Sequence, residues 1–250
     1  MDEERKEPTP GDRRHRPLPH HVGHRERLRR RARGAGLNHL PDYELLELFL
    51  FRSQPQGDVK PLARALLDRF GSLAAVLAAS VEDLMTVRAP DIRGRMKGVG
   101  AETALDLAAL HEIARRVTLE EAARRPVISS WTALVAYVRL SLQHEPREQF
   151  RVLFLDRKNQ LILDEIQNRG TVDHAPVYAR EVMRRALELS ASSVILVHNH
   201  PSGDPTPSGA DITMTREVVD AGRALKISVH DHLVVGREGV ASFKALGLFR

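Results

Sequence analysis

The chain has 250 residues with 42% hydrophobic and 28% charged side chains, as in a water-soluble globular protein with room for one large domain or two ordinary ones. It contains no cysteine, which excludes disulfides, thiolate nucleophiles, zinc sites with cysteine ligands and the zinc nucleobase deaminases. No apolar segment approaches the roughly 18 residues needed to cross a bilayer, so we expect a cytoplasmic protein with no membrane partner.

The net charge of +5 is concentrated at the N-terminus. Residues 1–34 hold eleven Lys or Arg against six Asp or Glu, so the remaining residues are neutral on balance. With several prolines and few apolar side chains, this basic tail over residues 1–34 is expected to be disordered up to about Arg25. Two interpretations stay open, a solubilising tail and an arm that contacts DNA phosphates.

Residues 35–120 are expected to form an all-helical domain. Asp42 stands where it would cap a helix with a core-facing apolar stripe, and Gly71 stands where a helix would end. Ser80 is placed to cap a further short helix whose first turn is acidic. Short helices with short connections indicate a compact helical module.

Gly98 and Gly100 flank Val99 directly ahead of a helical run. A glycine pair of this kind resembles the second half of a helix-hairpin-helix, which grips the DNA backbone without reading sequence. Residues 88–95, RAPDIRGR, separate the preceding helix from this turn, whereas in that motif the helix runs almost directly into it. The turn is therefore either a DNA backbone contact or a plain connection between two packed helices.

Charged residues cluster and apolar periodicity lapses over residues 118–126, where we place a domain boundary. Beyond it, over residues 127–250, strands and helices interleave, which predicts an α/β domain with a mixed sheet covered by helices. The expected elements are a helix capped by Ser130, strands over 150–156 and 161–167, a helix over 179–189, a strand over 192–197, a helix over 208–225 and a strand over 228–236.

A histidine pair ends the most apolar of these strands. His198 and His200 are expected to face the same side, about 6–7 Å apart along the backbone, so that two imidazole nitrogens can reach one ion. Ser208 and Asp211 follow at the start of the next helix and offer a carboxylate to the same place. The alternative for Ser208 and Asp211 is a capping box with no role at a site.

The segment HNHPSGDPTPSGAD matches the His-x-His-Pro-x6-Ser-x2-Asp pattern of JAMM (MPN) metal-dependent hydrolases, and it resembles the bacterial RadC family in particular. The segments DEIQNRGTVD, AREVMRRALELSASSVILVHNHPSGDPTPS and HDHLVVG are similar to that family as well. The resemblance covers about residues 25 to 250. It implies a cytidine-deaminase-like JAMM/MPN sheet, preceded by an all-α, helix-hairpin-helix-like domain.

The resemblance also implies one zinc ion per chain, held by His198, His200 and Asp211 with water in the fourth position, as in catalytic zinc sites. Glu165, five residues before Gly170, takes the family's role of general base, and Ser208 donates to the developing oxyanion. The implied function is a zinc metallopeptidase that hydrolyses peptide or isopeptide bonds of a peptide or protein substrate. Asp164 is expected to face the opposite side of the strand from Glu165.

Other interpretations stay open for these residues. Glu165 would otherwise be a surface acid on an edge strand. His230 and His232 are expected to have no part in the site, one on a strand face and one packed near the sheet end, with support of a zinc ligand as the other interpretation. The alternative function is a DNA-associated repair or recombination accessory protein whose zinc site is structural or silent.

Overall fold

The computed structural model describes residues 23–91, 94–123, 126–127, 130–169 and 178–248. Two compact units make up the chain, the first from Met1–Arg69 with Val87–Gly98 and the second from Phe70–Thr86 with Val99–Arg250. This division differs from the boundary expected over residues 118–126. The first unit is therefore smaller than the expected helical domain, and the second takes part of it.

The described part of the first unit is mainly helical. Its elements are α1 His24–Ala35, a 3-10 helix η1 Leu37–His39, α2 Asp42–Ser53, α3 Lys60–Phe70, β1 Arg88–Pro90 and β2 Met96–Gly98. The helix α2 begins at Asp42 with Pro41 in the capping position, so the cap expected at Asp42 is wrong. Gly71 follows α3 with a φ of +86°, as expected for a residue that ends a helix.

The disorder expected for the basic tail does not extend over residues 24–34, because these residues lie within helix α1. Leu28 is buried. Arg25 donates to the carbonyls of Phe51, Gln54 and Gly57, and its guanidinium lies over the Phe51 ring. These contacts offset the ordering entropy of a segment that has little apolar surface. Residues 1–22 of the expected tail lie outside the described residues.

The segment RAPDIRGR also corrects the all-helical prediction, because β1 and β2 pair antiparallel across it. The turn is closed by the Asp91 side chain, which accepts from the backbone and guanidinium of Arg95, and by Gly94 with a φ of +73°. Alternation over three residues is too short to predict a strand, which explains why this ribbon was not expected. The glycine turn therefore follows a β-ribbon rather than a helix.

The second unit carries a five-stranded mixed sheet in the order β4-β3-β5-β6-β7, in which β5 and β6 are parallel and the other neighbours antiparallel. The expected mixed sheet is confirmed, and β7 is an added edge strand. The elements are α4 Leu73–Ala78, α5 Val81–Thr86, α6 Ala101–Ala123, α7 Trp131–Leu142, β3 Gln149–Leu155, β4 Leu161–Arg169, α8 Ala179–Glu188, β5 Ser193–Asn199, α9 Gly209–Leu225, β6 Ser228–Gly236 and β7 Gly239–Ser242.

The predicted serine caps of α5 and α7 differ in their hydrogen bonds. Ser80 accepts from the amide of Asp83, as expected for the cap of α5. Ser130 occupies the N-cap position of α7, as expected, but its side chain makes no capping bond. Its hydroxyl oxygen lies 3.2 Å from the carbonyl oxygen of Pro126 and 3.4 Å from that of Ala122 instead.

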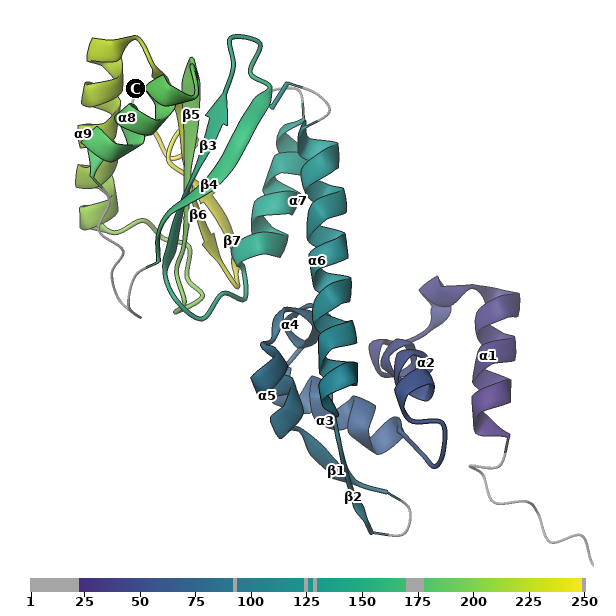
Figure 1. The fold of residues 1–250 in the computed structure, drawn as a ribbon. Coiled ribbons are helices and arrows are strands. Elements are labelled where there is room, and N and C mark those ends of the chain that lie inside the picture. Colours follow the sequence, from purple (N-terminus) through teal and green to yellow (C-terminus); the bar gives the residue numbers. More distant parts are fainter. Residues whose placement is uncertain (1–22, 92–93, 124–125, 128–129, 170–177, 249–250) are drawn as a thin grey trace, which may run out of the picture. The chain divides into compact units, whose positions relative to one another are not determined.

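Helices cover both faces of this sheet, with α7 and the end of α6 on one side and α8 and α9 on the other (Figure 1). Buried strand side chains alternate between two cores, so Val194 and Leu196 of β5 face α8 and α9 while Ile195 and Val197 face α7. Continuing that alternation places His198 on the α8 and α9 face. Among the described helices, none is both long and apolar enough to cross a membrane.

Candidate metal centre

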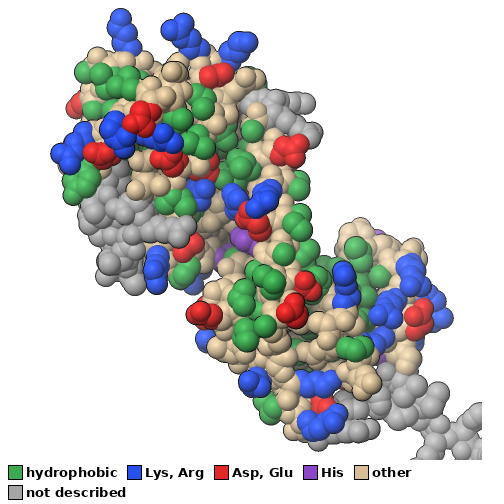
Figure 2. Space-filling model, in the orientation of Figure 1, with side chains coloured by type: hydrophobic (Ala, Val, Ile, Leu, Met, Phe, Trp, Pro, Cys, Tyr) green, Lys and Arg blue, Asp and Glu red, His purple; other side chains and the backbone are tan. Residues whose placement is uncertain are grey.

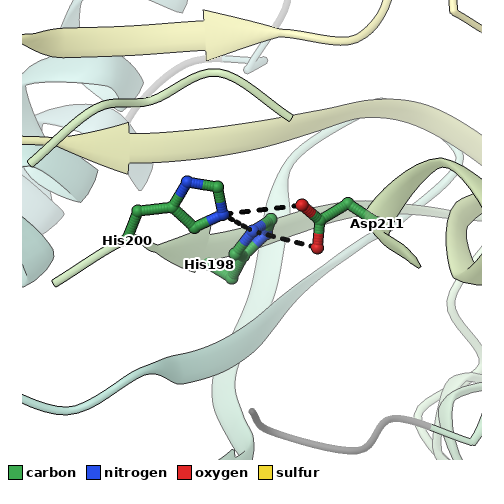
Figure 3. A group of neighbouring side chains, drawn as sticks. All are labelled: His198, His200 and Asp211. Carbon is green, nitrogen blue, oxygen red and sulfur yellow. Dashed lines mark hydrogen bonds and ion pairs between the residues drawn. The ribbon is translucent and has the colours of Figure 1, made fainter. Parts of the chain in front are cut away.

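Three side chains converge where β5 ends and α9 begins (Figure 3). His198 is on β5, buried to 1% exposure, and its ring stacks on Phe150 of the neighbouring strand. His200 lies one residue beyond β5, where its amide donates to the carbonyl of Val235. Asp211 lies in the first turn of α9. The expected convergence of these residues is confirmed.

The distances within this group are short enough for one ion to bridge all three side chains. His198 Nε2 lies 3.0 Å from His200 Nε2 and 3.3 Å from Asp211 Oδ1, and His200 Nε2 lies 3.5 Å from Asp211 Oδ2. One potential ligand atom from each residue lies within 4.8 Å of the other two. Two imidazole nitrogens and one carboxylate oxygen are ligands that suit a divalent transition metal.

Hydrogen bonds to the far side of the His200 ring decide which nitrogen is available to an ion. His200 Nδ1 lies 2.9 Å from the carbonyl oxygen of Asp204, and a carbonyl can only accept, so Nδ1 carries a proton. In the neutral ring the Nε2 lone pair then points at His198 and Asp211. The possible ligand atoms of the three side chains therefore lie close together, and a cation between them would be stabilised by their lone pairs.

Charges within the group shift the ionisation of its members. The neighbouring Asp211 carboxylate raises the pKa of His200, burial opposes that shift, and the charge of Glu148 adds slightly to it. Burial would raise the pKa of Asp211, but the two histidines beside it and the hydrogen bond from Ser208 outweigh burial and hold that pKa far below its usual range. Asp211 is therefore an anion at neutral pH, as a metal ligand must be.

Ser208 and Asp211 also form the capping box that the sequence allowed as an alternative. The Ser208 hydroxyl accepts from the Asp211 amide at 3.2 Å, and Asp211 Oδ2 accepts from the Ser208 amide and hydroxyl, both at 2.7 Å. Oδ1 is the oxygen nearer His198. The two interpretations are thus compatible, because the cap fixes the carboxylate that the cluster uses.

Asn199, between the two histidines, points to the opposite face and anchors the segment before β3. Its Oδ1 accepts from the amide of Gln149, and its Nδ2 donates to the carbonyls of Glu145 and Arg147. This segment carries Glu148, which lines the same cleft as His198, His200 and Asp211. Glu148 was missed from the sequence, because nothing local shows that the start of β3 lies beside the end of β5.

Glu165 is not brought into this group. Glu165 on β4 pairs with Val152 on β3, and Val152 pairs on its other side with Leu196 on β5. Glu165 therefore lies two strand spacings, or about 10 Å, from β5. The Glu165 carboxylate accepts from Arg185 at 2.8 Å and from Gln167 at 2.9 Å. Asp164 faces the other side, toward Tyr137 and Arg151, as expected.

His232 lies at the site, contrary to the preferred expectation. It is fully buried on β6, beside β5, and its Nε2 lies 2.8 Å from His198 Nδ1. The other side of its ring meets Thr215 of α9, a residue that the sequence gave no reason to select. The signal was present in the second His-x-His pair, but its meaning depends on β6 lying parallel to β5. His230 instead contacts Asn159, as expected for a residue outside the site.

One comparison with known proteins bears on this domain. Residues 128–248 match a family model described as the RadC-like JAB domain. The match covers the sheet and all three members of the His-His-Asp group. Residues 25–127, which the sequence resemblance also included, lie outside it, and the expected helix-hairpin-helix stays a prediction.

Proposed function

The chain is a RadC family protein by its C-terminal JAB/MPN domain, and from that premise we propose that it is a zinc-dependent metallohydrolase that cleaves peptide or isopeptide bonds. The JAB/MPN family includes zinc JAMM metallohydrolases. The observation that carries the proposal is the convergence of His198, His200 and Asp211, with their donor atoms within 4.8 Å of one another. Three protein ligands would leave a fourth position on a zinc ion for water or substrate, as in catalytic zinc sites.

A zinc ion held by these three residues would lower the pKa of a water molecule to about 7 and polarise a substrate carbonyl. The residues around it must then move protons. A general base takes a proton from the attacking water, the water oxygen joins the carbonyl carbon, the C–N bond breaks, and the proton passes to the leaving nitrogen. The products are a carboxylic acid and an amine.

Two glutamates are candidates for the general base. The sequence resemblance favours Glu165, but its carboxylate is held by Arg185 and Gln167 and would have to leave both. Glu148 lines the cleft with the three candidate ligands, and its charge acts on His200. We therefore favour Glu148 as the base and keep Glu165 as the alternative, because a base must lie within one hydrogen bond of the water.

Ser208 is proposed to donate to the carbonyl oxygen as negative charge develops there. It lines the cleft, and its hydroxyl hydrogen now goes to Asp211 Oδ2. During the reaction that hydrogen would turn to the substrate oxygen, while the Ser208 amide still holds Asp211. Ser208→Ala should accordingly slow cleavage by about 10²–10³ in kcat, as loss of one oxyanion donor does.

The test is hydrolysis of a mixed library of peptides and lysine-linked isopeptides by zinc-loaded protein, read by mass spectrometry. We expect cleavage by the wild-type protein and by Glu165→Gln, and none by Glu148→Gln, with zinc bound in all three. The opposite behaviour of the two variants would give the role of base to Glu165. A wild-type protein that holds zinc and cleaves no library member would contradict the hydrolase proposal.

A second candidate function is DNA association, and helix α1 is the observation that favours it. The sequence of α1, HRERLRRRARGA, has one acidic residue among six arginines, of which five are exposed. Blue side chains gather over this helix (Figure 2). Such a helix can contact phosphates in any DNA sequence, together with the Gly98–Gly100 turn proposed from the sequence. In this proposal the protein would serve in repair or recombination.

Salt-dependent DNA binding tests this candidate. The variant Arg29→Gln/Arg30→Gln/Arg33→Gln changes exposed arginines of α1, and Arg180→Gln/Arg184→Gln/Arg216→Gln changes the same number in the second unit. The slope of log affinity against log salt concentration reports the number of counterions released on binding. If α1 contacts phosphates, the first variant should release up to about three fewer counterions than the wild-type protein, and the second variant should release as many as the wild-type protein does. Equal behaviour of both variants would remove α1 from the proposal.

A further inference from the structure

A hydrogen-bonded chain leads from the helix α9 to the ring of His198. The Thr215 hydroxyl oxygen lies 2.6 Å from the backbone carbonyl of Asp211 and 2.6 Å from His232 Nδ1. His232 Nε2 then lies 2.8 Å from His198 Nδ1. Thr215 and His232 are both fully buried, so this chain is shielded from water. It begins at the backbone of Asp211, whose own side chain meets the far side of His198.

The hydrogens in this chain can be placed by counting. A contact of 2.6 Å between two oxygens needs a hydrogen between them, and the carbonyl of Asp211 has none to give, so the Thr215 hydroxyl donates there. The hydroxyl has a single hydrogen. Its second contact must therefore be one in which it accepts, and His232 Nδ1 is the donor.

The count continues through His232. The His232 ring is fully buried and contacts the rings of Phe150, His198 and Phe243 and the Thr215 hydroxyl. None of these contacts is with a carboxylate that could pair with a charged ring, so the ring is neutral and carries one proton. With that proton on Nδ1, Nε2 can only accept. His198 must then donate from Nδ1, which leaves the lone pair of its Nε2 directed at His200 and Asp211.

We propose that Thr215 and His232 are positioning residues that fix the tautomer of His198, so that its Nε2 is free to bind a metal ion. Only the expected effect on zinc affinity rests on the proposed metal centre. The tautomer of His198 is a property of the metal-free protein. The opposite tautomer would place a proton on His198 Nε2, in the space where a metal would bind. Hydrogen bonds of this kind orient metal-binding histidines and tune their affinity.

Two substitutions at Thr215 separate this role from packing. Thr215→Val keeps the shape and removes the hydroxyl, so nothing selects between the tautomers of His232. Thr215→Ser keeps the hydroxyl and loses a methyl group. We expect Thr215→Val to bind zinc about tenfold to a hundredfold more weakly than the wild-type protein, and Thr215→Ser to restore most of that affinity.

The direct readout is long-range 1H–15N correlation spectroscopy of the histidine rings in metal-free, 15N-labelled protein at pH 8.5, where an ordinary imidazole is neutral. The wild-type protein should show His198 and His232 both protonated on Nδ1 and bare on Nε2. Thr215→Val should show the other tautomer at both rings in part of the population, and Thr215→Ser should not. Spectra of a His232→Gln variant assign the signals.

The outcomes distinguish the inference from the metal centre itself. A wild-type spectrum with the His198 proton on Nε2 would overturn the inference, whatever the protein binds. So would a Thr215→Val variant with wild-type tautomers and wild-type zinc affinity. If the tautomers are as expected but the wild-type protein binds no zinc, the proposed metal centre fails while the hydrogen-bonded chain stands.

Discussion

Asp164 and Glu165 are neighbours in the sequence, and their carboxylates lie on opposite faces of the same strand. Asp164 is 4% exposed and accepts from Tyr137 and from two nitrogens of Arg151. Burial, together with the charge of Asp164, raises the pKa of Tyr137 to about 12. Glu165 is 30% exposed and pairs with Arg185. One acid is therefore part of the core, while the other remains partly open to solvent.

This difference predicts unequal effects on stability. Asp164→Asn leaves the mostly buried side chain of Arg151, which is 12% exposed, without its carboxylate and should lower the free energy of unfolding by about 3 kcal/mol. Glu165→Gln removes a partly exposed pair and should cost less than about 1 kcal/mol. Urea unfolding of both variants measures this, and equal losses would show that the two faces are not distinguished as described.

Gly236 provides a second prediction, because it lets a loop approach closely behind His200. A Cβ at Gly236 would lie 2.2 Å from the carbonyl oxygen of Gly203 and 2.9 Å from the nitrogen of Pro205. The backbone from Gly203 to Pro205 would therefore have to shift. That backbone includes Asp204, whose carbonyl accepts from His200 Nδ1. Gly236→Ala should therefore weaken zinc binding by about tenfold or more, measured by competition with a chromophoric chelator.

The matched control is Gly209→Ala at the start of α9. A Cβ there meets nothing within 4 Å, although Gly209 is adjacent to Ser208. This variant should bind zinc as the wild-type protein does. If Gly236→Ala also bound zinc unchanged, the position of the Asp204 carbonyl would not matter to the site.

A third prediction concerns pH and His230, away from the metal group. Burial lowers the pKa of His230, and the charge of Lys244 lowers it further. The folded protein therefore binds the proton less readily than the unfolded chain, whose histidine pKa is about 6.5. The resulting contribution to stability is complete above pH 6.5 and is lost as the pH falls through the lower folded pKa.

His230→Gln tests this dependence, because an amide can still donate to Asn159 but does not titrate. With a chelator present, the wild-type protein should lose more stability between pH 7.5 and 5.5 than the variant. Other histidines titrate equally in both proteins and cancel in the comparison. Identical losses would mean that His230 does not contribute.

Sequence alone predicted those parts of the site that depend on local geometry. His198, His200, Ser208 and Asp211 lie within 14 residues, so strand alternation and a helix start were enough to bring them together. Glu148, Thr215 and His232 could not be found in this way. Their places depend on β3 and β6 being the neighbours of β5, and strand order is a property of the whole fold.

The same distinction holds for the fold. The alternating elements of residues 127–250 predicted the mixed sheet, because each strand and helix has its own apolar pattern. Helix α1 was missed because a single buried leucine and an arginine over Phe51 stabilise it, and composition gives no sign of either contact. The β1–β2 ribbon was missed because it is held by one turn rather than by an apolar pattern.

The central claim is that His198, His200 and Asp211 hold one metal ion, and metal content tests it most directly. Protein equilibrated with zinc and freed of excess is analysed by plasma mass spectrometry, beside His198→Ala/His200→Ala and the control His230→Gln. We expect about one zinc per chain in the wild-type protein and the control, and almost none in the double variant. A folded wild-type protein without zinc, or a double variant that keeps it, would contradict the account.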